Sequence, residues 1–296
     1  MNPKILLGLA VGIACSIIWG GHAVVARPAL AGQGFQPIDL AAFRYAPAAL
    51  LLAPLAWQAR DALLHIGWRR LLVLSFFGGA PNLLLFVCAL LFAPASHGGT
   101  IAPMVMPVAG ALLAIPMIGE WPSRGRAAAL TVMGAGVLMI GWDGVSGNHP
   151  GAWRGDILLA LAGTTWAVFT LLLRRWQVPA IPATAAVTMI SAVFVLPFWL
   201  PWRAAEVAQI PVGPLIVQFV AQGVALGALA MFLYARAVEL LGPTRAATLS
   251  IMVPVTALLL AAFLLEEPIS LLQGLGAALA AGGMLAAVLF TGRRTA

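Results

Sequence analysis

The most constraining feature of this sequence is a series of apolar runs, each about as long as a bilayer is thick. A helix needs about 20 apolar residues to cross a hydrocarbon core of about 30 Å. Charges, prolines and glycine clusters separate ten such runs: 5–26, 38–57, 70–93, 98–118, 125–142, 154–174, 182–201, 213–235, 243–264 and 270–291. The sequence therefore predicts an all-α integral membrane protein with ten transmembrane helices.

Composition excludes the alternatives to a membrane protein. Of 296 residues, 62% are hydrophobic and only 8% are charged, whereas a soluble domain carries about 25% charged residues and a disordered chain has low hydrophobicity. Cys15 and Cys88 both lie inside apolar runs, so neither a disulfide framework nor a thiolate metal site is predicted, and no cofactor is expected. The first run is too long for the apolar region of a signal peptide, and we interpret it as an uncleaved span.

The positive charges alternate along the predicted topology. The net charge is +7, but the cations are scattered, so nucleic acid is not an expected partner. One set of alternate ends holds Lys4, Arg60, Arg69, Arg70, Arg124, Arg126, Arg174, Arg175, Arg236, Arg245, Arg293 and Arg294. The other set holds only Arg27, Arg154 and Arg203, and Arg44 falls inside the second span. Because cytoplasmic loops carry the excess of Lys and Arg, both termini are predicted to be cytoplasmic.

The chain matches itself at an offset of 147 residues. In this register 104–121 aligns with 251–268 without a gap, and the paired residues are Trp19 with Trp166, Pro107 with Pro254, Glu120 with Glu267 and Gly136 with Gly283. We predict two domains of five spans each, 1–147 and 148–296. Because five is odd, the second domain enters the membrane from the opposite side. Inverted repeats are typical of secondary transporters, whose substrate sites lie near the midplane between the repeats.

These motifs resemble the drug/metabolite transporter superfamily, specifically its paired EamA-type repeats. The resemblance rests on IIWGGHAVVAR (17–27) and TTWAVFTLLLRR (164–175), and most specifically on PVAGALLAIPMIGEWPS (107–123) and PVTALLLAAFLLEEPIS (254–270). His22 stands where such proteins often carry Asn. The resemblance implies an exporter of neutral or aromatic amino acids in a bacterial inner membrane, or else a broad carrier of drugs and other metabolites. Its partners would be the small-molecule substrate and the lipid bilayer.

Polar residues inside spans are the candidate substrate contacts, because they are costly in hydrocarbon. Arg44 would bind a substrate carboxylate, hold Asp39 near the outer mouth, or extend to the outer headgroups. His22 would bind substrate, carry a proton, or make a hydrogen bond between helices. Trp19 and Trp166 are expected to meet near the pseudo-symmetry axis and offer aromatic faces, unless they serve only packing. The remaining candidates are Gly79 and Asn82 in the third span, and Gln218, Gln222 and Tyr234 in the eighth.

Prolines and glycines suggest how the spans move and pack. Pro103, Pro107 and Pro254 are candidate hinges, because an interior proline removes a backbone hydrogen bond and permits a kink. A static kink is the alternative. The glycine-rich fifth and tenth spans are expected to pack closely against other helices. Glu120, Glu266 and Glu267 lie at span ends, where we expect them to cap helices or pair with loop arginines.

Two other classes of membrane protein fit the sequence poorly. An enzyme would have to use Ser96, His97 and His149, and there is no GxSxG, HExxH or pair of acids for acid–base catalysis. His97 and His149 are expected to be solvated in outer loops. A channel would need a ring of polar residues, and no nucleotide-binding loop supports ATP-driven transport. We therefore predict a secondary carrier and no enzymatic activity, with the coupling ion, direction and oligomeric state left open.

Overall fold

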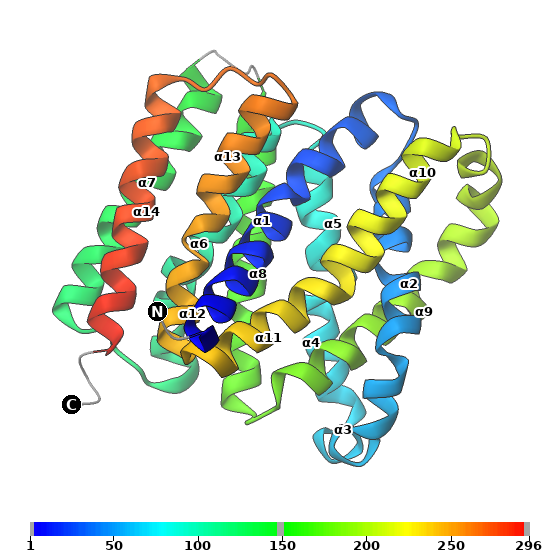
Figure 1. Cartoon of the computed structure of the whole chain (residues 1–296), viewed down its shortest axis with the longest axis horizontal. Helices are drawn as coiled ribbons and strands as arrows, with labels where there is room; N and C mark the ends of the chain where they lie inside the picture. The colour runs from blue at the N-terminus through cyan, green and yellow to red at the C-terminus, as the bar shows by residue number, and fades with distance from the viewer. Residues whose placement is uncertain (1–2, 147–150, 293–296) are drawn as a thin grey trace.

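The chain folds into a bundle of membrane-length helices (Figure 1). The computed structural model describes residues 3–146 and 151–292. Backbone groups in hydrocarbon must hydrogen-bond within the protein, so an apolar run that crosses a membrane becomes a helix. The elements are α1 (Pro3–Gly32), α2 (Pro37–Gln58), α3 (Arg60–Ile66), α4 (Trp68–Gly78), α5 (Ala80–Ala89), α6 (Ala95–Ile118), α7 (Arg124–Ser146), α8 (Ala152–Arg175), α9 (Ala180–Val207), α10 (Val212–Gln218), η1 (Phe219–Leu229), α11 (Ala230–Leu241), α12 (Pro243–Leu249), α13 (Met252–Leu264) and α14 (Leu271–Gly292).

Nine helical stretches in the described residues are long and apolar enough to span a bilayer. Two of them are composite: α4 continues into α5, and α10, η1 and α11 form one rod. The remaining span is built from α12 and the 13-residue α13, which is too short to cross alone. The predicted all-helical membrane fold with paired repeats is confirmed.

The two halves of the chain meet through helices that the 147-residue offset relates. Helix α2 packs on α9, and α7 packs on α14, as Figure 1 shows at the two ends of the bundle. Between these pairs, α1 packs on α11 and α13, and α6 packs on α8. The helices nearest the middle of the bundle therefore come from both halves.

The glycine-rich α7 and α14 approach each other closely, as predicted. A Cβ on Gly136 would lie 2.4 Å from the Gly276 carbonyl oxygen, and one on Gly283 would lie 2.7 Å from the Met133 backbone nitrogen. A Cβ on Gly134, in contrast, would have no atom of a neighbouring helix, among the described residues, within 4 Å. Only one stripe of the glycines therefore makes the helix contact, and it does so because backbone approaches backbone.

Two breaks interrupt predicted spans. The first is at Gly79 between α4 and α5, and the second lies between α12 and α13. Pro254 is the third residue of α13, and a proline in the first turn removes no intrahelical hydrogen bond. Pro254 therefore does not lie in a helix interior as the sequence predicts, whereas Pro103 and Pro107 do lie inside α6. The hinge role of all three prolines stays a prediction.

The helix ends on the side away from the termini are closed by buried polar contacts. His97 is fully buried in α6, so its expected place in a solvated loop is wrong. His149 lies outside the described residues. Glu267 caps α6, because its Oε1 and Oε2 accept hydrogen bonds from the backbone N–H groups of Ala95 (2.7 Å) and Ser96 (2.9 Å).

On the side of the termini, Glu120 pairs with Arg174 of α8, which is one of the expected pairs between a span-end acid and an arginine. Both side chains are about half exposed. Exposed pairs of this kind contribute little to stability. This pair therefore contributes less to stability than a buried contact would.

Candidate functional site

A polar cluster lies among α1, α2, α5 and η1, and we name His22, Arg44 and Gln222 the central cluster. Gln222 is fully buried and His22 is 9% exposed. The side chains of Arg44 and Gln222 both interact electrostatically with His22. The Phe86 ring is stacked on the His22 ring, with 4.5 Å between the centroids. Three of the predicted site residues, from three separate spans, are thus brought together.

Each member of the central cluster has a polar atom without a partner. The buried Nη1 of Arg44, Nε2 of His22 and Oε1 of Gln222 make no hydrogen bond of normal geometry. Within residues 3–146 and 151–292, Arg44 also forms no salt bridge. Because a buried guanidinium nitrogen without a partner is costly, this arrangement is suited to a negatively charged ligand group.

The backbone of η1 brings Gln222 into this cluster. Phe219–Leu229 is an 11-residue π-helix, a rare geometry that often occurs at functional sites. It lies close to α2, since a Cβ on Gly223 would lie 2.2 Å from Pro47 Cγ and one on Gly227 3.2 Å from the Arg44 carbonyl oxygen. The absence of side chains at these glycines lets η1 contact the backbone that carries Arg44.

Gln218 is partly satisfied by the protein itself. Its Nε2 donates to the Val25 carbonyl oxygen at 3.0 Å, and its Oε1 lies 3.5 Å from Gln222 Nε2. Both glutamines are buried, so the predicted shared face is present. Gln218 holds Gln222 in place, and Gln222 presents the free oxygen.

The two repeat-related tryptophans have different ring partners. Trp19 packs against Tyr234 of α11 with centroids 5.4 Å apart, and Trp166 packs against Phe169 of its own helix at 5.3 Å. Trp19 is one helical turn before His22, so the Trp19–Tyr234 pair adjoins the central cluster. Trp166 is 38% exposed, and its predicted meeting with Trp19 stays a prediction.

Gly79 and Asn82 hold helices together at the α4–α5 break. The Ala80 N–H donates to Ser191 Oγ of α9 at 3.1 Å, and a Cβ on Gly79 would lie 2.4 Å from that same oxygen. Asn82 Nδ2 donates to the Ala162 carbonyl oxygen and to Thr165 Oγ1 of α8, each at 2.7 Å. The Asn82 amide donors are therefore used between helices.

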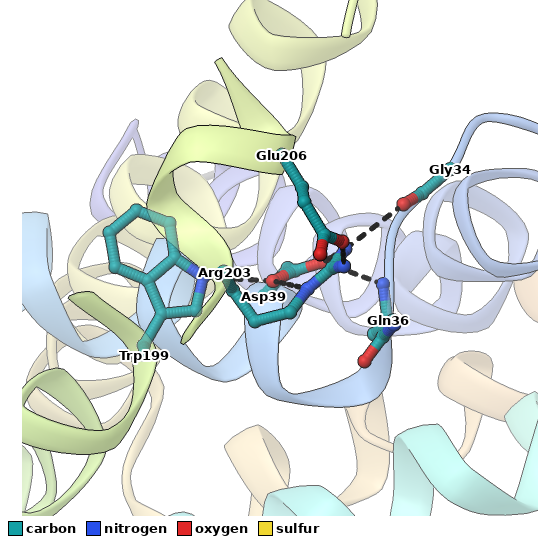
Figure 2. Close-up of polar contacts among 6 residues, drawn as sticks. All are labelled: Gly34, Gln36, Asp39, Trp199, Arg203 and Glu206. Carbon is teal, nitrogen blue, oxygen red and sulfur yellow. Dashed lines mark hydrogen bonds and ion pairs between the residues drawn. The ribbon is translucent and has the colours of Figure 1, made fainter. Parts of the chain in front are cut away.

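The proposed alternative in which Arg44 holds Asp39 is wrong. Figure 2 shows Asp39 bound instead by Arg203 of α9, with Nη2–Oδ2 at 2.8 Å and Nε–Oδ1 at 3.1 Å. Trp199 Nε1 also donates to Asp39 Oδ1 at 2.8 Å. Arg203 further binds Glu206 and the Gly34 carbonyl oxygen. We name Asp39, Trp199 and Arg203 the α2–α9 clamp.

Sequence reasoning did not identify three residues at this centre. Phe86 stacks on His22, and Tyr45 interacts with both Arg44 and Ser191. Ser191 lies 147 residues after Arg44, so the repeat offset could have identified it. Nothing in the sequence marks Phe86, because a phenylalanine in an apolar run has no distinguishing pattern.

Comparison with known families supports a pair of repeats. The sequence profile of a family described as the EamA-like transporter family matches residues 6–142 and again 153–289. The second match is the first displaced by 147 residues. Together the matches cover most of the chain.

Solved structures share this fold. Thirteen chains match significantly, whereas no curated protein does. One of the thirteen, described only as the crystal structure of a protein, covers 98% of this chain and 99% of its own length with a TM-score of 0.62. The two sequences are 18% identical, so the likeness is one of fold alone.

Proposed function

The chain belongs to the EamA-like transporter family of the drug/metabolite transporter superfamily, and we propose that it exports neutral and aromatic amino acids. Members of this family are secondary transporters of small metabolites, not enzymes, and they work in a membrane. The narrower proposal concerns the substrate. It rests on the unpaired guanidinium of Arg44 in the central cluster.

The charge of the central cluster favours a substrate with a carboxylate. Arg44 has a buried Nη1 without a partner, and an arginine fork binds carboxylate oxygens in a bidentate manner. A substrate with only a positive charge would be repelled there. We therefore propose that Arg44 binds the α-carboxylate, and that His22 Nε2 adds a hydrogen bond.

The rest of an amino acid also has complementary groups nearby. The Oε1 of Gln222 makes no hydrogen bond of normal geometry within the protein and can accept one from the ammonium group. The Trp19–Tyr234 pair offers aromatic faces to an apolar or aromatic side chain. Neutral and aromatic amino acids fit these groups better than acidic ones, which would bring a second charge.

Competition in proteoliposomes tests this proposal. We expect labelled phenylalanine to exchange across the membrane, and unlabelled neutral amino acids to compete. Arg44→Gln should reduce exchange by at least about tenfold, because it removes a charge-assisted pair. Arg69→Gln, which changes an arginine at the other end of the bundle, is the matched control. The absence of saturable exchange for any amino acid would contradict the amino-acid proposal.

A broad carrier of other metabolites is the second candidate. The same Arg44 would bind the carboxylate of an organic acid that has no amino group. If such acids compete as well as amino acids, and Gln222→Ala affects both equally, the broader function is correct. If Gln222→Ala weakens competition by amino acids but not by organic acids without an amino group, the contact between Gln222 and the ammonium group is supported.

We also propose an orientation in the membrane, based on which ends of the spans carry the Lys and Arg residues. In the predicted topology, the more basic set of twelve cations falls on the side of the termini, which we propose to be the cytoplasm of a bacterial cell. Reporter fusions after Gly119 and after Ala208 test it. The fusion after Gly119 should be cytoplasmic, and the one after Ala208 should be external.

A further inference from the structure

A second buried polar cluster lies apart from the central cluster, at the first turn of α6. We name its members His97, Asp156 and Gln273 the α6–α8–α14 triad. His97 is 0% exposed, Gln273 1% and Asp156 8%. Asp156 Oδ1 lies 2.7 Å from His97 Nδ1, and Gln273 Nε2 lies 2.7 Å from His97 Nε2. An imidazole–carboxylate pair in a membrane bundle is a common form of proton site.

Hydrogen bonds around Gln273 determine where the proton of His97 lies. The Ser270 N–H donates to Gln273 Oε1 at 3.2 Å, so the amide nitrogen of Gln273 faces His97. That nitrogen can only donate, and therefore His97 Nε2 accepts. The His97 ring is then neutral and shares its single proton, on Nδ1, with Asp156.

Uptake of a second proton is incompatible with this arrangement. A proton on His97 Nε2 would face the donating amide nitrogen, so the Gln273 amide must turn until Oε1 accepts from Nε2–H. Ser270 N–H then loses its acceptor at the start of α14. Ser270 Oγ also donates to Asp143 Oδ1 of α7 at 2.7 Å, so the rearrangement reaches the α7–α14 pair.

The triad is also connected to the central cluster through packing. Gly98 follows His97, and a Cβ on Gly98 would lie 2.9 Å from Ala23 Cβ and 3.8 Å from Phe86. Ala23 adjoins His22, and Phe86 stacks on His22. A shift of the first turn of α6 therefore changes the surroundings of His22 directly.

Other charged groups near the first turn of α6 also affect how readily His97 binds a proton. Glu267 caps α6, Asp143 binds Ser270, and Arg27 of α1 donates to the Leu90 carbonyl oxygen at 2.7 Å. Arg154 of α8 lies over the Trp153 ring. Asp156 lies within hydrogen-bond distance of the His97 ring.

We propose that the α6–α8–α14 triad is a proton-binding site that couples proton uptake to substrate transport. The proton binds at His97 Nε2, Asp156 holds the resulting imidazolium, and the turned Gln273 amide transmits the change to α14. The link to transport rests on the carrier function proposed above. Proton binding itself does not depend on the identity of the substrate.

The first experiment uses protons alone as the probe. Histidine-labelled full-length protein in nanodiscs is titrated by NMR between about pH 5 and 8, with signals assigned by single His→Gln variants. We expect His97 to carry its proton on Nδ1 at the alkaline end and to gain a second proton on acidification. Asp156→Asn should weaken that uptake, and the exposed His65→Gln should leave it unchanged. An unchanged His97 ring over the whole range would overturn the proposal.

A second measurement follows the transmitted change. Hydrogen–deuterium exchange at Ser270, corrected for the intrinsic effect of pH, should increase when His97 is protonated. Gln273→Leu should make this exchange independent of pH, because no amide remains to turn. Exchange that depends on pH equally in both proteins would overturn the assigned route.

The final measurement tests coupling in proteoliposomes with labelled phenylalanine. A pH gradient should drive accumulation by the wild type, and His97→Gln and Asp156→Asn should reduce it by at least about tenfold. Exchange without a gradient should stay within about twofold in both variants, as in His65→Gln. Accumulation by the wild type that does not depend on the pH gradient would overturn the proposed coupling. If no amino acid is transported, the amino-acid proposal fails while the NMR titration still decides proton binding.

Discussion

Asp39 at the start of α2 and Arg203 near the end of α9 form a two-point ion pair that joins the two halves of the chain. Their side chains are 0% and 9% exposed, and Trp199 donates a further hydrogen bond to Asp39. Each residue sits on the side away from the termini, where it closes the α2–α9 interface. Secondary transporters with inverted repeats open alternately to the two sides, and we expect this pair to break when the protein opens on the side away from the termini.

Removing the charge of Asp39 should loosen this closure. Asp39→Asn leaves Arg203 buried without its main partner, which costs about 3–5 kcal/mol when one side of a buried pair is lost. Thermal unfolding in nanodiscs measures this cost. Glu206→Gln is the control, because Glu206 is 65% exposed and an exposed pair contributes about 0–1 kcal/mol. Equal losses in both variants would contradict a special role for Asp39.

The close approach of α7 and α14 makes a second prediction. Gly136→Val should lower the stability of the protein by about 1–3 kcal/mol, the usual cost of overpacking, because its Cβ would lie 2.4 Å from the Gly276 carbonyl oxygen. A Cβ on Gly134 would have no such neighbour within 4 Å, so the stability of Gly134→Val should differ little from that of the wild type. Melting temperatures of the two variants compare them directly. A larger loss in Gly134→Val would rule out this packing.

The tryptophans supply a third prediction. Trp19→Ala and Trp166→Ala should both impair transport while leaving insertion intact, and Trp19→Ala should have the larger effect, because Trp19 adjoins His22 and packs on Tyr234. A loss of at least about 1 kcal/mol, or about fivefold in flux, is expected from an aromatic contact. Exchange assays after checking membrane expression measure it. Normal flux in both variants would remove these residues from the site.

The prolines supply a fourth prediction with its own control. Pro107→Ala should slow the transport cycle, because it restores an interior hydrogen bond in α6 and makes the helix less able to bend. Pro254→Ala should not, because Pro254 lies in the first turn of α13. Turnover at saturating substrate compares the variants. A slower cycle in Pro254→Ala alone would place the hinge in α13.

Much of the fold was predictable because the bilayer restricts the choices. Apolar length determines where helices cross, and the repeated Trp, Pro and Glu residues revealed the two halves. The breaks were harder to locate. At the Gly79 break, Ser191, more than a hundred residues away, accepts a hydrogen bond from the backbone N–H of Ala80, and no local pattern marks this contact.

The candidate site is predictable in part for the same reason. Polar residues in hydrocarbon stand out, so the sequence alone marks His22, Arg44 and Gln222 as candidates. It does not mark their partners, because partner choice depends on how helices pack. Asp39 pairs with Arg203 across 164 residues, and His97 is buried against Asp156 of α8 and Gln273 of α14.

The π-helix η1 has a consequence for how this protein tolerates changes of chain length. Each residue of an α-helix advances the chain by about 100° around the axis, so deleting one residue within Phe219–Leu229 would rotate Tyr234 away from Trp19 or Gln222 away from His22. Single-residue deletions there should thus be more harmful than substitutions at lipid-facing positions such as Val220, which is 50% exposed. The register of this one span, more than the identity of its apolar residues, keeps the two ends of the site aligned.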